Sequence, residues 1–271
     1  MAWIYAIPVW LFAICVIAAS VALSAAGVLI TRRLFPHGDQ ITHNDVAGPI
    51  VSTLGTILAV ILSFMVIAVW QEYDAAAATV QSEVNAICDL YHDASTLPQP
   101  LKGDVQTELA RYVHVVVHDE WPLMREGRNS AAAHVQAFRV LKIVAALKTH
   151  GAEQDAMRTD MVSLTHIFND SRRQRLFDNS QAIPAIMWWI LLFISVVTIA
   201  SAYLFRVANV HAHIIMTSAL TGVIAAILIL IAQFDLPFRG DIQIQPTAFS
   251  HALTAIAEDP PNSEYSPSAP R

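Results

Sequence analysis

The sequence predicts an all-α membrane protein with four transmembrane helices and a helical-bundle domain inserted between the second and third. Hydrophobic residues make up 55% of the 271-residue chain and charged residues only 14%, against about 25% charged in soluble domains. The shortfall is concentrated in four windows that lack Asp, Glu, Lys and Arg: Met1–Thr31, Val46–Gln71, Asn179–Phe205 and Val207–Phe234. Each is longer than the about 20 apolar residues that a helix needs to cross a membrane.

These windows divide the chain into four parts. Residues 1–70 hold the first two spans, at about 8–31 and 48–70, and residues 71–183 form the helical domain. Residues 184–236 hold the third and fourth spans, at about 184–205 and 213–234. Residues 237–271 are a post-membrane segment that ends in a Pro/Ser-rich tail, which is expected to be disordered.

The second span is the element that joins the two kinds of structure. After Trp70 the sequence turns polar, but no proline or glycine interrupts it before Pro98. We therefore expect one continuous helix that leaves the membrane at Trp70 and becomes the first helix of the domain. The loop before this span, Phe35–Asp45, contains Pro36, Gly38 and Asn44 as breakers.

Breakers also divide the polar domain, at Pro98–Pro100, Gly127–Asn129 and Gly151. They predict helices at about 72–96, 101–125, 130–149 and 152–179. No strand alternation is present, so the domain is expected to be an all-α bundle.

Small residues follow one side of the second span. Gly48, Ser52, Gly55, Ala59 and Ser63 are spaced by 4, 3, 4 and 4 residues, and Thr56 lies beside them. One interpretation is close packing against another helix; the other is a pore or symmetry axis lined by this helix. The hydroxyl groups suit both, because they can bond back to backbone carbonyls.

The same span contains bulky residues that could form an apolar constriction: Ile57, Ile61, Phe64 and Met65. A pore gated by such a constriction needs no charge. The absence of charged residues from the spans argues against proton-coupled transport and voltage sensing, which need such groups.

Charged residues near the membrane ends of the domain suggest structural ion pairs. Asp235 closes the fourth span, and Arg239 is its expected partner. Arg172, Arg173 and Arg175 precede the third span and have three interpretations: ion pairs with Glu72, Asp74 or Asp235, attraction to lipid headgroups or anions, or a solvated face.

Aromatic residues predict a membrane-interface belt on the domain side. Its members are Trp70, Tyr73, Trp188, Trp189 and Phe238. In the domain, the motif Glu120-Trp121-Pro122 has no nucleophile or paired base spaced with it, so we expect Trp121 to pack and Pro122 to bend or end a turn.

The sequence predicts no enzyme, no cofactor and no metal site. His114 and His118 are four residues apart on a helix, but no third ligand is evident, so a surface pair is the preferred interpretation. Cys15 and Cys88 show no disulfide or CxxC pattern. A net charge of −6 without a basic stripe argues against nucleic acid as a partner.

These features in this order resemble the bestrophin-like domain family of bacterial integral membrane proteins, a family of unknown function. The resemblance covers nearly the whole chain. The matching segments are N-D-V-A-G-P-I at Asn44–Ile50, G-T-I-L-A-V-I-L-S-F at Gly55–Phe64, V-W-Q-E-Y at Val69–Tyr73, E-V-N-A-I-C-D-L-Y at Glu83–Tyr91, R-Y-V at Arg111–Val113, E-W-P at Glu120–Pro122, R-R-Q-R-L at Arg172–Leu176 and D-L-P-F-R-G at Asp235–Gly240.

Through the bestrophins, which conduct anions such as chloride, the resemblance implies a ring of subunits whose second span lines an ion path. It also implies a cytosolic helical domain and a location in the inner membrane. No acidic calcium-binding cluster can be carried over onto this sequence. The preferred hypothesis is therefore a homo-oligomeric anion channel, with membrane lipid and a small inorganic anion as partners and the domain as its vestibule. The alternative is a non-conducting membrane scaffold or sensor whose domain binds a partner protein.

Overall fold

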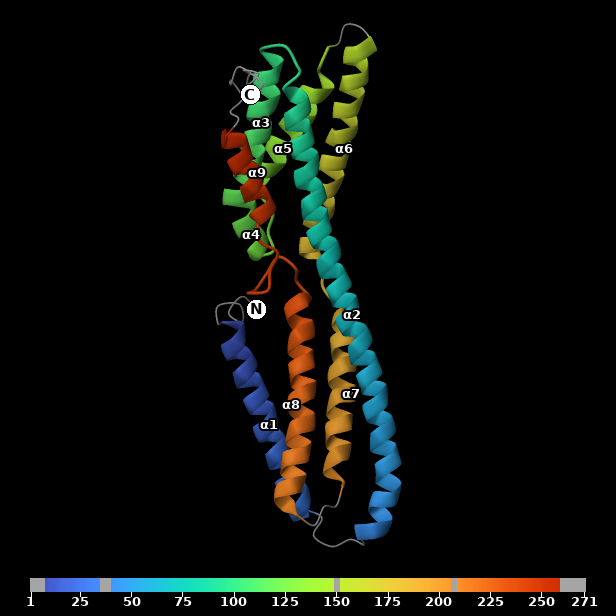
Figure 1. Cartoon of the computed structure of the whole chain (residues 1–271). Helices are drawn as coiled ribbons and strands as arrows, with labels where there is room; N and C mark the ends of the chain where they lie inside the picture. Colours follow the sequence, from blue (N-terminus) through green and yellow to red (C-terminus); the bar gives the residue numbers. More distant parts are fainter. Residues whose placement is uncertain (1–7, 35–39, 149–151, 206–208, 259–271) are drawn as a thin grey trace, which may run out of the picture. The chain divides into compact units, whose positions relative to one another are not determined.

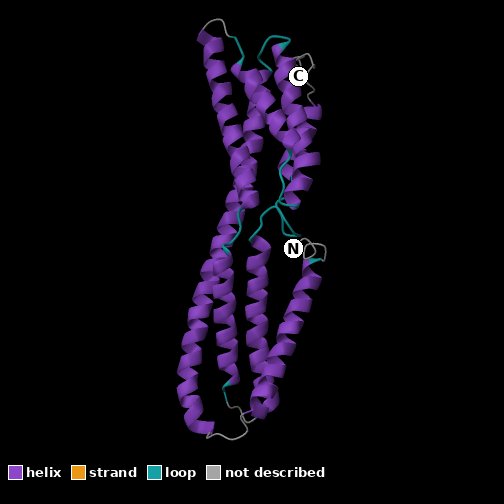
Figure 2. Ribbon diagram, turned by 180° about the vertical axis from the view of Figure 1, so that it is seen from behind, coloured by secondary structure: helices purple, strands orange, loops and turns teal. Residues whose placement is uncertain are grey.

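The computed structural model describes residues 8–34, 40–148, 152–205 and 209–258, and these residues form helices and loops without a strand (Figure 2). The all-α prediction is confirmed. The Pro/Ser-rich tail after Glu258 lies outside the described residues. The helices are α1 Val9–Leu34, α2 Gln40–Ala94, α3 Leu101–Val115, a π-helical turn Val116–Glu120, α4 Trp121–Arg125, α5 Ala131–Ala145, α6 Ala152–Ser180, α7 Ala185–Tyr203, α8 Val210–Phe234 and α9 Thr247–Glu258 (Figure 1).

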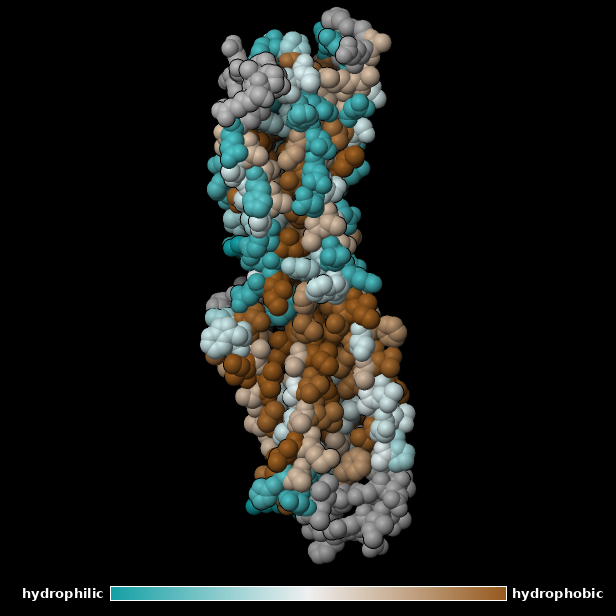
Figure 3. Space-filling view, viewed as in Figure 1, coloured by the Kyte–Doolittle hydropathy of each residue, from teal (hydrophilic) through white to brown (hydrophobic). Residues whose placement is uncertain are grey.

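Four of these helices are long and apolar enough to cross a membrane: α1, α2 from Gly48 onward, α7 and α8. Their outward side chains are largely apolar, among them Leu23, Phe64, Phe193 and Ile215. The space-filling view accordingly shows a predominantly hydrophobic surface over these helices (Figure 3). The prediction of four membrane-length helices is thus confirmed.

Helix α2 is continuous from Gln40 to Ala94, as expected from the absence of breakers before Pro98. It begins earlier than predicted, because Gln40–Asp45 is helical rather than part of a loop. No proline or glycine lies between Gln40 and Ala47, so Asn44 alone does not stop the helix. Pro49 is accommodated inside it.

The described chain divides into two compact units. We call the first the membrane unit: the residues up to Tyr73, Ala182–Leu236 and Gly240–Ile242. The second, the polar unit, contains Asp74–Gln181, Pro237–Arg239 and the residues from Gln243 onward. The polar unit therefore includes C-terminal residues that the sequence division placed in a separate post-membrane segment.

In the membrane unit, α1 packs along α8, and α7 contacts both. Small side chains allow this close approach. The Thr221 hydroxyl donates to the Ser24 hydroxyl at 3.1 Å, and Gly222 lies against Val21 and Ile17 of α1. Helix α8 begins a few residues before its predicted start.

The early start of α8 has a local cause at Asn209. The side-chain oxygen of Asn209 accepts hydrogen bonds from the backbone N–H groups of His211 and Ala212, at 3.0 and 3.3 Å. These N–H groups have no partner within the helix, so the asparagine caps it.

In the polar unit, α3 packs against α5 and α9, and α5 packs against α6. The helix predicted at 101–125 is interrupted by the π-helical turn Val116–Glu120. Pro122 follows this turn, has no N–H to donate, and its ring would collide with the carbonyl four residues before it. A local widening into a π-turn accommodates both effects.

Helix α9, Thr247–Glu258, was not predicted. It buries Phe249, Ala252 and Ile256, whose spacing of three and four residues marks one face of a helix. That pattern was present in the sequence, but it was not used to predict a helix.

Candidate functional site

The transmembrane part of α2 has one packed side. Leu58, Leu62 and Val69 are buried in a core with Leu191 of α7 and with Ile224 and Ile231 of α8. This core holds α2 in the membrane unit, and it decides which side of α2 remains free.

The small-residue stripe borders that core without joining it. Ser52, Thr56, Ala59 and Ser63 are exposed, and Gly48 and Gly55 are half-buried. A Cβ atom added to either glycine would meet no described heavy atom within 4 Å. The stripe is therefore not used for packing among the described residues of its own chain.

The hydroxyl groups of α2 bond back to its own backbone, as expected. Thr53 donates to the Pro49 carbonyl at 2.8 Å, Thr56 to the Ser52 carbonyl at 2.9 Å and Ser63 to the Ala59 carbonyl at 2.8 Å. Their hydrogens are thus occupied, whereas their oxygen lone pairs remain on the free side of the helix.

The four candidates for an apolar constriction share one side of α2, because positions i, i+4, i+7 and i+8 lie along one face of a helix, but their surroundings differ. Ile57 and Phe64 are exposed, whereas Ile61 and Met65 pack against the core of the membrane unit. An α-helix turns by about 100° per residue, so Phe64 lies roughly 140° around α2 from Ala59. The candidates therefore do not share the face of the stripe, and two of them, Ile61 and Met65, are engaged with the core of the membrane unit.

The polar unit encloses a buried charge network, which we define as Glu83, Tyr112, Glu120, Arg172 and Arg175. Arg175 donates to both Glu83 oxygens, at 2.6 and 3.0 Å, and to Glu120 at 2.9 Å. Arg172 donates to the other Glu120 oxygen at 2.7 Å. All five side chains are buried, and two positive charges offset two negative ones.

Tyr112 completes the network by donating its hydroxyl hydrogen to Glu83. Burial and, after it, the negative charge of Glu83 raise the pKa of Tyr112 well above its usual value, so the phenol remains a donor. Burial acts to lower the pKa of Arg175, but Glu83, Tyr112 and Glu120 together outweigh it, and the pKa is well above the ordinary value. The guanidinium therefore stays charged.

Aromatic side chains cover Arg175. The Trp121 and Phe249 rings lie 5.4 and 5.5 Å from its guanidinium carbon, within cation–π range. The Trp121 indole N–H donates to the Ile244 carbonyl at 3.1 Å, and the Trp121 ring meets Phe238 edge-on at 5.8 Å. Trp121 packs as expected, but Phe238 is buried in the polar unit rather than placed in an interface belt.

The predicted ion pairs have different partners in the structure. Arg172 and Arg175 pair with Glu83 and Glu120, not with Glu72, Asp74 or Asp235. Glu72 is exposed, and the exposed Arg173 pairs with Asp170 of the same helix. The arginines in this segment thus divide into two buried network members and one surface residue.

Asp235 and Arg239 are likewise bonded separately. Asp235 accepts from the Ile183 backbone N–H at 2.6 Å and from the side chain of Trp188. Arg239 donates to the Asn179 carbonyl at 3.0 Å. The proposed partner of Asp235 was wrong because the main chain and an indole meet its hydrogen-bonding needs.

Sequence reasoning missed Glu83, Tyr112 and Glu120 as network members. Glu83 occurs among Val80, Val84 and Ile87, the positions of α2 that face the core of the polar unit. An acidic side chain at a buried position needs a buried cation as its partner. The occurrence of Glu83 among apolar core positions could therefore have indicated a buried ion pair.

The histidine pair named in the sequence analysis does not form part of a larger cluster of metal ligands among the described residues. The His114 and His118 rings lie 4.3 Å apart, and no group of three metal-ligating residues occurs in the described part of the chain.

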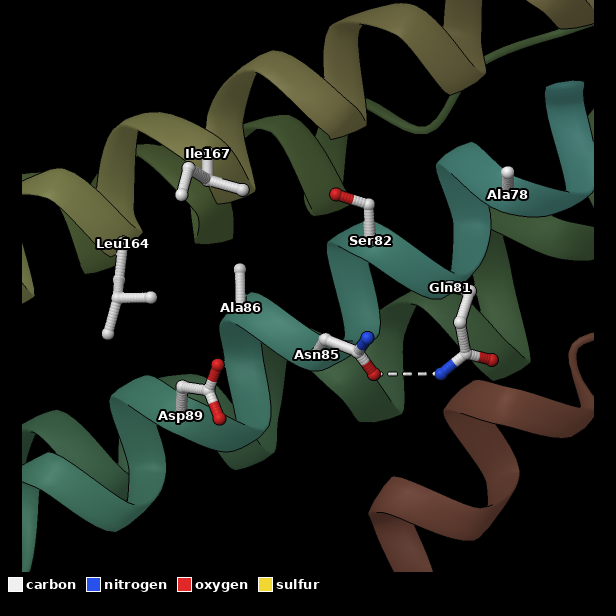
Figure 4. A pocket seen from close by; sticks show the side chains of 8 residues that line it. All are labelled: Ala78, Gln81, Ser82, Asn85, Ala86, Asp89, Leu164 and Ile167. Atoms are coloured by element: carbon white, nitrogen blue, oxygen red, sulfur yellow. Dashed lines mark hydrogen bonds between the residues drawn. The ribbon is translucent and has the colours of Figure 1, made fainter.

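An open groove of about 370 Å³ lies between α2 and α6. It is lined by polar residues such as Gln81, Asn85 and Asp89 and by Leu164 and Ile167 (Figure 4).

Comparisons with known proteins place the chain in a family. A family model described as a bestrophin-like domain matches residues 18–249, whereas no curated protein matches. A crystal structure of a membrane protein carrying a single substitution matches with a TM-score of 0.70 at 13% identity, over 92% of this chain and 100% of that one.

Two structures of a bacterial bestrophin homologue from Klebsiella pneumoniae, each with one substitution, show the same fold. One matches with a TM-score of 0.67 at 12% identity over 88% of this chain and 98% of its own. The other has a TM-score of 0.68 at 13% identity over 91% and 99%. By the family match and this fold, the chain is a member of the bestrophin-like domain family.

Proposed function

We propose that this protein is a homo-oligomeric ion channel, permeable to small inorganic anions, in which the small-residue stripe of α2 lines the path. The observation that carries the proposal is the free side of α2. Gly48 and Gly55 stand open and Ser52, Thr56, Ala59 and Ser63 are exposed, although small residues in membranes ordinarily serve close helix packing. Membership of the bestrophin-like family supports the same function.

A ring of copies accounts for this free side. Lipid chains make few contacts with small side chains such as glycine and serine, so the stripe is not well suited to face lipid. If several α2 helices surround a common axis, the stripe instead presents hydroxyl oxygens and backbone to a path along that axis. Ile57 and Phe64 would then face neighbouring copies or lipid, because they lie on another side of α2 than the stripe. With no charged side chain between Gly48 and Trp70, the path would select and gate by its width and polarity.

Leucine at Ala59 or Ser52 is expected to reduce chloride flux into proteoliposomes at least tenfold, because it adds bulk to the path without touching the core of the membrane unit. Ala22→Leu is the matched control, since Ala22 is an exposed small residue on α1. Native mass spectrometry would show that each variant keeps the wild-type subunit number. Equal flux in all variants would remove the stripe from the path.

The non-conducting scaffold is the competing outcome. If the wild-type protein carries no salt-gradient-driven anion flux at a lipid ratio that ensures one oligomer per vesicle, conduction is excluded. A monomeric protein in native lipid nanodiscs would exclude the ring as well. No observation in the described residues favours a particular protein partner.

We further propose a multi-pass location in the inner membrane with the polar unit in the cytosol. Cys88 lies at the surface of the polar unit. Partial desolvation of its thiol and, after it, the negative charge of Asp89 raise the pKa of that thiol. A membrane-impermeant maleimide at pH 8.5, where more thiolate forms, is expected to label Cys88 only after the cells are opened. Cys88→Ser identifies the labelled site, and labelling of intact spheroplasts would reverse the orientation.

A further inference from the structure

We propose that the polar unit binds a small amphipathic organic anion, a carboxylate with a short apolar chain, in a pocket of about 350 Å³. We call it the end pocket, because it lies where α2 and α5 end and α3 and α6 begin. Its size suits a small molecule. This inference is independent of whether the membrane unit conducts ions.

One wall of the end pocket is apolar. Leu97, Pro98 and Leu101 come from the α2–α3 connection and the start of α3, and Leu147 comes from the end of α5. Met157 of α6 adds a thioether, whose sulfur lies 2.9 Å from the Thr96 hydroxyl oxygen. Such a wall favours a hydrocarbon chain over a fully polar ion.

Two cationic side chains make another part of the pocket lining positively charged. Lys148 and Arg158 line the pocket, and the described residues of its lining include no acid. The Arg158 Nε is buried and has no hydrogen-bond partner among the described residues, and the guanidinium donates to the Ala145 carbonyl only at 3.4 Å. Because arginine keeps its charge and has donors but no acceptor, the group that completes this site is an anion.

A helix end adds to the positive potential. Leu101 begins α3, and the N–H groups of its first turn are only weakly bonded: Lys102 donates to the Pro98 carbonyl at 3.3 Å and Gly103 to the Gln99 side-chain oxygen at 3.4 Å. The first N–H groups of a helix carry a partial positive charge. Asp104, in the first turn of α3, offsets part of this charge, so the two cations remain the main attraction for a carboxylate.

Together these features define the ligand by chemistry. A guanidinium fork recognises a planar carboxylate through paired hydrogen bonds, and the leucine wall accepts the chain attached to it. Divalent cations are disfavoured by Lys148 and Arg158. A chain of about six carbons fits a pocket of this size, which makes hexanoate a suitable probe.

The test uses the full-length protein in lipid nanodiscs with 13C-methyl methionine. Hexanoate is expected to shift the Met157 methyl signal saturably, with Met157→Leu identifying the signal. Met187 and Met216 are exposed on the membrane unit, so their signals report hexanoate that merely enters the lipid. 1-Hexanol, which has the same chain without the charge, is expected to bind at least tenfold more weakly.

Arg158→Gln is expected to weaken hexanoate binding at least tenfold, whereas Arg139→Gln, at an exposed arginine of α5, should leave it unchanged. Should Arg158→Gln fail to fold, Arg158→Lys keeps the charge but removes the fork and should weaken binding several-fold. The proposal is overturned if Met157 shows no saturable shift, if hexanol binds as tightly as hexanoate, or if both Arg158 variants bind like the wild type.

Discussion

Replacing Arg175 with methionine is expected to destabilise the polar unit by about 3–5 kcal/mol, the cost of removing one partner from a buried ion pair. Arg175 bonds to both Glu83 and Glu120, so its loss leaves two buried carboxylates with Arg172 as the remaining network cation. The methionine fills much of the same volume. The expected loss therefore comes from uncompensated charge rather than from a cavity.

Hydrogen exchange of the buried α3 amides measures this change, because it reports the free energy of opening within one part of a protein. Arg173→Met is the control: Arg173 is exposed and pairs with Asp170 on the surface of the same helix, and such pairs contribute about 1 kcal/mol or less. If the two variants exchange at similar rates, the network contributes no more than a surface pair. Adding Glu83→Gln to the Arg175→Met variant should restore part of the loss, because it removes the carboxylate charge that Arg175 compensated while the amide oxygen can still accept the Tyr112 hydroxyl.

Replacing Trp121 with alanine is expected to cost a similar amount, about 3–5 kcal/mol, as for other large core residues. Trp121 is buried between Phe238 and Phe249 and covers Arg175. Its indole also holds the Ile244 carbonyl. Both Phe249 and Ile244 belong to the C-terminal segment, so we expect α9 to detach from the polar unit before α3 and α5 separate.

Limited proteolysis tests the order of these events. In the Trp121→Ala variant, cleavage between Ile244 and Glu258 should become at least tenfold faster while the remainder of the polar unit stays intact. Trp121→Phe keeps an aromatic ring but loses the indole hydrogen bond, so its effect should be intermediate. Uniform cleavage throughout the polar unit would show that α9 is not a separately released element.

The membrane-length helices could be predicted because their cause is local. A span needs only an uncharged apolar run of sufficient length, and α1, α7 and α8 follow that rule to within a few residues at each end. The continuity of α2 followed in the same way from the absence of breakers. Helix α9 shows the limit of this reasoning, because its short apolar pattern is interpretable only beside the core that it covers.

The arginines show why the site was harder to predict. Arg172, Arg173 and Arg175 have the same chemistry and adjacent positions, yet two are buried and one is exposed. Helical rotation separates them, but only the packing of α2, α3 and the π-helical turn around α6 provides Glu83, Tyr112 and Glu120 as partners. Residues this far apart in the chain meet through tertiary structure alone.

Hydropathy and breakers along the chain were sufficient for the helical class, the four membrane-length helices and the continuation of α2 beyond Trp70. They were not sufficient for the two sides of α2, one packed and one free. That difference depends on where α7 and α8 place Leu191, Ile224 and Ile231. Whether a side chain is buried depends on its neighbours in space, and the hydropathy pattern of one helix does not determine which other helices pack against it.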